Sequence, residues 1–97
     1  MRNYQPQKNN PYKLPHNLYM RMLYLIRDYD RMKTSSGSHT ELDAVDHALH
    51  SIPKEYRLGV WNNVCYRTPY PTDAGEATYK RWRCRFIYNL AKELHKI

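Results

Sequence analysis

Apolar residues recur at spacings of three and four along most of this chain, which is the period of an amphipathic α-helix. Between residues 15 and 32 these positions fall on one helical face, with Pro15 at the favoured first turn. The stripe consists of Leu18, Tyr19, Met22, Leu23, Ile26 and Tyr29. Because no segment alternates apolar and polar residues as a strand does, the sequence predicts an all-α fold.

Four helices are predicted in total, and turn-forming residues separate them. They span about residues 15–32, 41–51, 53–66 and 75–95. Pro53 both stops the second helix and starts the third, because proline lacks the amide hydrogen that a helix interior needs. Asp73, three residues before Glu76, resembles a capping box at the start of the fourth helix. Gly59 lies inside the third helix, which indicates a close approach of another helix at that point.

The length of the chain, 97 residues, suits one small domain. Residues 1–13 are rich in Gln, Asn and Pro and have no periodic apolar positions, so we expect a flexible basic arm there. Residues 14–97 are then a single helical domain. Its expected architecture is a small bundle of about four helices, in which the last two form a C-terminal helix-turn-helix-like unit.

Charge narrows the kinds of partner that this domain can have. Sixteen Lys and Arg against nine Asp and Glu give a net charge of +7, which favours nucleic acid or another acidic partner. Residues 1–34 and 53–97 each carry a net charge of +5, whereas residues 35–52 carry −3. We therefore expect a phosphate-binding surface to come from the two basic segments and not from the acidic second helix.

The last helix combines five basic residues with four aromatic residues between positions 76 and 94. Projected at 100° per residue, its large apolar side chains gather on one side. These are Tyr79, Trp82, Phe86, Leu90 and Leu94, with Ile87 at the edge of the cluster. The opposite side and its flanks supply six candidate DNA contacts: Thr78, Lys80, Arg81, Arg85, Tyr88 and Lys92. A charged face is more often simply solvated, but the near absence of acids over about five turns favours a nucleic-acid interface.

Arg83 is an exception to this division of the last helix. On the helical projection it falls among the apolar positions. Two arrangements would accommodate it: its stem extends across the core to solvent, or it pairs with an acid such as Asp43 or Asp46. Either way we expect a structural role for Arg83 and not a DNA contact.

Short stretches of the chain resemble a known group of regulators. "IPKEYR" and "ATYKRW" are similar to the "LPxxYR" and "xxTVKxR" landmarks of region 4 of sigma-70 factors. "YKLPHNLYMRMLYLIRDYDRMK" resembles the opening of small Firmicutes phage and prophage transcriptional regulators related to the RinA/ArpU-type late-gene activators. The likeness covers most of the chain from Tyr12 onward. It implies a helix-turn-helix protein in which Thr78, Lys80 and Arg81 lie at the entry of the recognition helix.

The function that we prefer on these grounds is a DNA-binding transcriptional regulator, encoded by a phage or prophage and acting in the cytoplasm of a bacterial host. The last helix would enter the major groove of double-stranded DNA. Thr78, Arg81 and Arg85 would reach base edges, while Lys80, Lys92 and the basic arm would contact phosphates. A homodimer would bind DNA more tightly than one copy of so small a protein, so a second copy of the chain is also a candidate partner.

The alternative is a small basic protein-interaction module without DNA binding. Its partner would be RNA polymerase, a host defence protein or another acidic protein. Tyr88 and its Arg neighbours would form the hot spot, because Tyr and Arg are enriched at such sites. Composition alone separates the two functions poorly.

Other chemistry has little support in the sequence. His47 and His50 lie three apart but lack a third ligand, so we expect no metal site. Cys65 and Cys84 are not in a CxxC pair, and we expect reduced thiols. Isolated glycines and the absence of paired carboxylates argue against an enzyme and against a cofactor. No apolar run approaches the 18 residues of a membrane span, so we expect no membrane partner.

Overall fold

The computed structural model describes residues 11–34 and 39–97 of the chain, and in these ranges it contains five α-helices and no strand. The helices are α1 His16–Arg27, α2 Tyr29–Thr34, α3 Thr40–His50, α4 Lys54–Tyr66 and α5 Glu76–Glu93. The predicted all-α bundle is confirmed. Most of the expected basic arm, residues 1–10, and part of the connection between the first two predicted helices, residues 35–38, lie outside the described residues.

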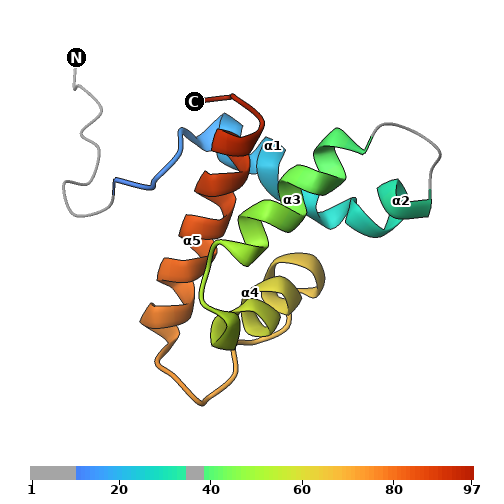
Figure 1. The fold of residues 1–97 in the computed structure, drawn as a ribbon. Helices are drawn as coiled ribbons and strands as arrows, with labels where there is room; N and C mark the ends of the chain where they lie inside the picture. Colours follow the sequence, from blue (N-terminus) through green and yellow to red (C-terminus); the bar gives the residue numbers. More distant parts are fainter. Residues whose placement is uncertain (1–10, 35–38) are drawn as a thin grey trace.

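Helix α5 is the central element of the bundle, and it packs against α1, α3 and α4 (Figure 1). Its fully buried side chains are Tyr79, Phe86, Ile87, Leu90 and Ala91. Trp82 and Leu94 are partly buried against the same core. The predicted inward face of the last helix is therefore confirmed. Ile87 and Ala91 add to this buried face, so that it is wide enough to pack against three neighbouring helices.

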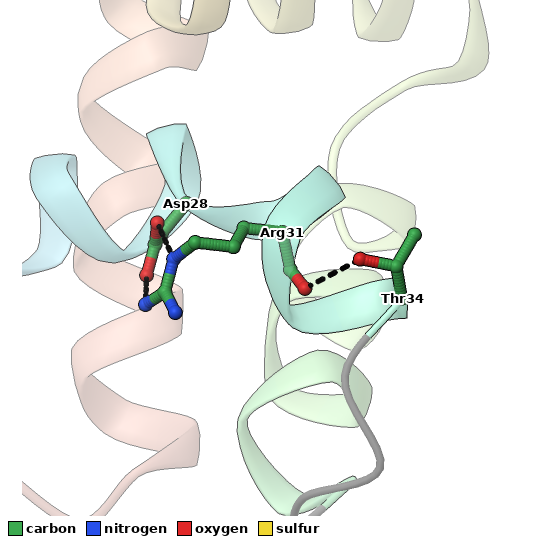
Figure 2. Close-up of polar contacts among 3 residues, drawn as sticks. All are labelled: Asp28, Arg31 and Thr34. Atoms are coloured by element: carbon green, nitrogen blue, oxygen red, sulfur yellow. Dashed lines mark hydrogen bonds and ion pairs between the residues drawn. The ribbon is translucent and has the colours of Figure 1, made fainter.

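The first predicted helix, residues 15–32, is two helices in the structure, with Asp28 between them. The Asp28 N–H still bonds to the carbonyl of Tyr24 at 3.1 Å, while its own carbonyl accepts the N–H of Met32 at 2.9 Å and so opens α2. The Asp28 carboxylate accepts hydrogen bonds from the Arg31 guanidinium, the Nε bond being 2.7 Å long (Figure 2). Thr34 Oγ1 donates to the Arg31 carbonyl at 3.0 Å and closes the last turn of this short helix.

Contacts with other helices explain why the chain turns at Asp28. After the turn, the Tyr29 hydroxyl donates to Asp46 of α3 at 2.8 Å, and the Tyr29 ring lies edge-on to Trp61 of α4 at 5.1 Å. Just before the turn, Arg27 Nε donates to the Val64 carbonyl at 2.8 Å. Tyr29 fits the apolar stripe of a continuous helix, so periodicity predicted no break; packing and hydrogen bonding to α3 and α4 outweigh that local preference.

The connection between α4 and α5 contains a turn at residues 72–74 and no helix. Arg67 ends α4 in the left-handed conformation, at φ 56°. Helix α5 begins after Gly75, and no side chain caps its first amides. The predicted capping box is wrong: the Asp73 carboxylate accepts the Tyr79 hydroxyl at 2.6 Å instead. This bond joins the connection to the buried side of α5.

Gly59 confirms the close approach predicted within the third helix of the sequence, now α4. A Cβ atom at this position would lie 2.6 Å from Tyr79 Cε1 and 2.8 Å from Pro71 Cδ. No side chain fits in that space, because real Cβ contacts are longer than 3.0 Å. The absence of a side chain at Gly59 therefore lets α4 approach both α5 and the connection.

Candidate nucleic-acid interface

Four aromatic rings fix the first turns of α5 against α4 and the connection. Tyr79 stacks on Tyr70 with ring centroids 5.3 Å apart, and it lies edge-on to Tyr56 at 5.3 Å. Tyr56 in turn stacks on Trp82 at 6.1 Å. Such offset and edge-on pairs add to the stability gained from burial alone. Because this cluster holds one side of the first turns in place, the opposite side, which carries Arg81, faces solvent.

Arg81 and Lys92 are exposed residues of the candidate surface, one in each half of α5. They are separated by about 16 Å along the helix axis, at a rise of 1.5 Å per residue. Neither side chain forms an ion pair within residues 11–34 and 39–97. Unneutralised guanidinium and ammonium groups on one helical face are the chemistry that phosphates bind.

Lys80 differs from these two because it has a partner on its own helix. Its Nζ lies 3.0 Å from Oε2 of Glu76, one turn earlier, and this hydrogen bond raises the pKa of Lys80. The sequence analysis noted a near absence of acids along the basic face, and Glu76 is an acid that pairs with one of its six candidate residues. An exposed pair of this kind is weak, and a phosphate can replace the carboxylate. Thr78 is half-buried and, two residues from both Glu76 and Lys80, points away from this pair toward the side of α5 that carries Arg81.

Arg85 and Tyr88 are the middle of the surface, and Tyr12 lies on both. The Tyr12 ring centroid is 4.0 Å from Arg85 Cζ, and the Tyr12 and Tyr88 rings meet edge-on at 5.1 Å. Cys84 Sγ also donates to the Tyr12 carbonyl at 3.4 Å. Both Arg85 and Tyr88 are half-buried as a result.

Tyr12 is the residue of this surface that the sequence prediction missed, since residues 1–13 were expected to form a flexible arm. The packed part of the chain also includes Tyr12, whose ring packs on Tyr88 of α5, while the nearby Leu14, already within the predicted domain, is buried. The signal was present in the sequence: Tyr12 and Leu14 are two apolar side chains at the end of an otherwise polar segment.

Arg83 lies on the core side of α5, as the helical projection predicted. Its guanidinium carbon is 5.9 Å from the centroid of the Tyr19 ring of α1. In the described part of the chain it forms no ion pair with Asp43 or Asp46; Asp46 accepts the Tyr29 hydroxyl instead. Its Nε is shielded from solvent and has no hydrogen-bond partner among the described residues. Of the two predicted arrangements, the pairing with an acid is therefore wrong.

The histidines of α3 and the cysteine of α4 have neighbours that do not indicate a metal site or a reactive thiol. His47 Nδ1 lies 3.5 Å from Glu93 Oε1, and His50 Nδ1 lies 2.8 Å from the Asp46 carbonyl. No group of three or more His, Cys, Asp or Glu side chains in the described ranges could hold a metal ion. Burial raises the pKa of the Cys65 thiol to about 11, which disfavours the reactive thiolate.

None of the helices described is long and apolar enough to cross a membrane.

Comparison of the chain with protein-family models, curated proteins and solved structures finds no significant match.

Proposed function

We propose that this protein binds double-stranded DNA through the basic face of α5 and acts as a transcriptional regulator of phage or prophage origin in the bacterial cytoplasm. The observation that carries the proposal is the pair of exposed cations, Arg81 and Lys92, which no acid neutralises within the described residues. The resemblance of "IPKEYR" and "ATYKRW" to sigma region 4 landmarks supports DNA as the polyanion.

The position of α5 in the bundle supports this use of its outer face. Three helices and an aromatic cluster hold the inner face, so the helix presents its cations on a rigid support. A rigid recognition helix loses little conformational entropy on docking into the major groove. Arg81 projects from the N-terminal half of α5, the half from which a recognition helix contacts base edges.

The test is a mobility shift of a random duplex at several salt concentrations. With four or five phosphate contacts, the affinity should fall about 10²- to 10³-fold between 50 and 200 mM salt. The double variant Arg81→Ala, Arg85→Ala should lose most of this binding, because both guanidinium groups lie on the proposed interface. The absence of any shift by the wild-type chain at 50 mM salt would overturn the proposal.

A control variant of equal charge separates this interface from general electrostatic attraction. Lys33 lies on α2, on the side of the bundle away from α5 (Figure 1). Arg67 ends α4 next to Tyr66, whose hydroxyl donates to Asp30 at 3.3 Å at the start of α2. Lys33→Ala with Arg67→Asn removes two positive charges and keeps a residue that tolerates the left-handed conformation at position 67. This variant should bind DNA nearly as well as the wild type.

One observation favours the second candidate, a module that binds RNA polymerase or another acidic protein. The Tyr12 and Tyr88 rings share the face with Arg81 and Arg85, and Tyr and Arg together are typical of protein hot spots. In that case the Arg81→Ala, Arg85→Ala variant loses binding to the purified acidic protein, and the wild type gives no DNA shift.

Under the DNA-binding proposal, a second copy of the chain is also a candidate partner. A homodimer would present two α5 helices and would bind a duplex that contains two sites.

A further inference from the structure

We propose that Tyr12 is a positioning residue that holds Arg85 for contact with a backbone phosphate of the nucleic acid. This inference rests on the proposed function, since it concerns the same surface. It also changes the expected role of Arg85, which the sequence analysis assigned to base edges. Arg85, supported by Tyr12, forms a contact that does not depend on the DNA sequence. This contact lies next to the N-terminal half of α5, from which Arg81 would contact bases.

The Arg85 guanidinium group lies over a ring that is itself held in place. The Tyr12 ring centroid lies 4.0 Å from Arg85 Cζ, close enough for a strong cation–π contact. Tyr12 is itself held from two sides, by the edge-on Tyr88 ring and by the bond from Cys84 Sγ to its carbonyl. Leu14, two residues after Tyr12, is buried and anchors the segment before α1 to the core. The ring is therefore a fixed support for Arg85.

The contact with Tyr12 leaves donors of Arg85 for a ligand. Arg85 Nε is shielded from solvent and has no hydrogen-bond partner among the described residues. Stacking covers a face of the guanidinium plane and leaves the in-plane Nη donors at its edge, where a phosphate binds in a forked geometry. An arginine held in this way needs no reordering when the phosphate arrives.

Arg85 and Arg81 differ in how far their side chains can extend from α5. A side chain that reads base edges must extend away from its helix into the groove. Arg85 is half-buried, with its Nε covered and its guanidinium under a ring from the segment before α1. Arg81, one turn earlier, is exposed and carries no such cover. The two arginines are thus suited to different tasks: Arg81 to bases and Arg85 to the backbone.

The test combines substitutions of Tyr12 with a double-mutant cycle on duplex binding by the full chain. Tyr12→Ala should weaken binding roughly 3- to 30-fold, the range expected for loss of a cation–π contact. Tyr12→Phe keeps the ring and should bind as the wild type does. Arg85→Ala should weaken binding to all duplex sequences alike and make the salt slope shallower by about 0.9. Adding Tyr12→Ala to Arg85→Ala should cause no further loss, because the ring acts through the arginine.

Tyr24→Ala is the matched control, since Tyr24 is a tyrosine of α1 with 60% of its surface exposed. It should change neither affinity nor salt slope. A second readout needs no DNA: the Tyr12 ring current should shift the Arg85 side-chain protons upfield, and the shift should vanish in Tyr12→Ala but persist in Tyr24→Ala. Melting curves, recorded for every variant, identify the temperature at which all of them are folded for these measurements.

The outcomes separate the inference from the proposed function. No binding of duplex DNA by the wild type would overturn both. Binding by the wild type with unchanged or tighter binding by folded Tyr12→Ala would overturn the inference alone, because the ring would then be a structural contact or a cover that competes with DNA. A change of base preference in Arg85→Ala would also overturn it, since a phosphate contact carries no sequence information.

Discussion

Two glycines in contrasting surroundings give the sharpest prediction at the scale of single residues. A Cβ at Gly59 would lie 2.6 Å from Tyr79 Cε1 and 2.8 Å from Pro71 Cδ. Helix propensity alone favours alanine over glycine at such a position by about 1 kcal/mol. Overpacking against a ring and a proline outweighs this, so Gly59→Ala should lower the free energy of unfolding by about 1–2 kcal/mol. Urea denaturation followed by circular dichroism measures the change.

Gly75→Ala is the control for that measurement. Nothing lies within 4 Å of a Cβ at this position, and its φ of −66° suits any residue. The free energy of unfolding should therefore stay within about 0.5 kcal/mol of the wild type or rise. Equal stability of the two variants would show that α4 can move away from Tyr79 at little cost.

At the scale of helices, the packing of α1 on α4 depends on Arg27. Its Nε donates to the Val64 carbonyl at 2.8 Å, in the last turn of α4, where carbonyls lack partners within the helix. Arg27→Met keeps most of the apolar stem and removes the donor. We expect the free energy of unfolding to fall by about 1.5–3 kcal/mol, as for other hydrogen bonds to charged groups. Thermal or urea unfolding measures the loss.

Arg21→Met is the control for this helix, because Arg21 is exposed on the same α1 and makes no hydrogen bond or ion pair within the described residues. Its unfolding free energy should match that of the wild type. A similar loss in both variants would mean that methionine on α1, and not the missing bond to Val64, causes the effect.

The helices also show how far the sequence predicts the fold. Strong periodicity located α3, α4 and α5 to within two residues at each end, and it identified the basic face of α5. Periodicity also predicted one continuous helix where the structure has α1 and α2, because Tyr29 continues the apolar stripe. The residues that Tyr29 contacts, Asp46 and Trp61, lie in distant segments of the chain and leave no local signal of the break. Tyr12 was missed for a similar reason: an apolar pair such as Tyr12 and Leu14 indicates that the segment packs somewhere, but it does not show that the partner is a helix 72 residues later in the chain.

At the scale of the whole molecule, two tyrosines make the fold sensitive to alkali. The hydrogen bond to Asp46 raises the pKa of Tyr29 to about 12, and the bond to Asp73, with burial, raises that of Tyr79 to about 12. The unfolded value is about 10. A raised folded-state pKa stabilises the protein below pH 10, and this contribution is lost as the pH rises from 10 through 12. We expect cooperative loss of helix in that window, accompanied by tyrosinate absorbance.

The double variant Tyr29→Phe, Tyr79→Phe is the comparison for the alkaline transition. It lacks both phenols and should be less stable at pH 8, yet its stability should change less between pH 10 and 12. Parallel curves of stability against pH for the variant and the wild type would contradict this explanation.

The central place of α5 has a consequence for how the protein is made. Helices α1, α3 and α4 all precede in the chain the helix that buries their apolar sides. At 5–20 residues per second, a ribosome needs roughly 3 to 13 seconds to progress from the end of α1 to the end of α5. During that interval Met22, Leu23 and Ile26 have no completed core to enter, so the nascent chain is most exposed to aggregation and to chaperones before its last helix is synthesised.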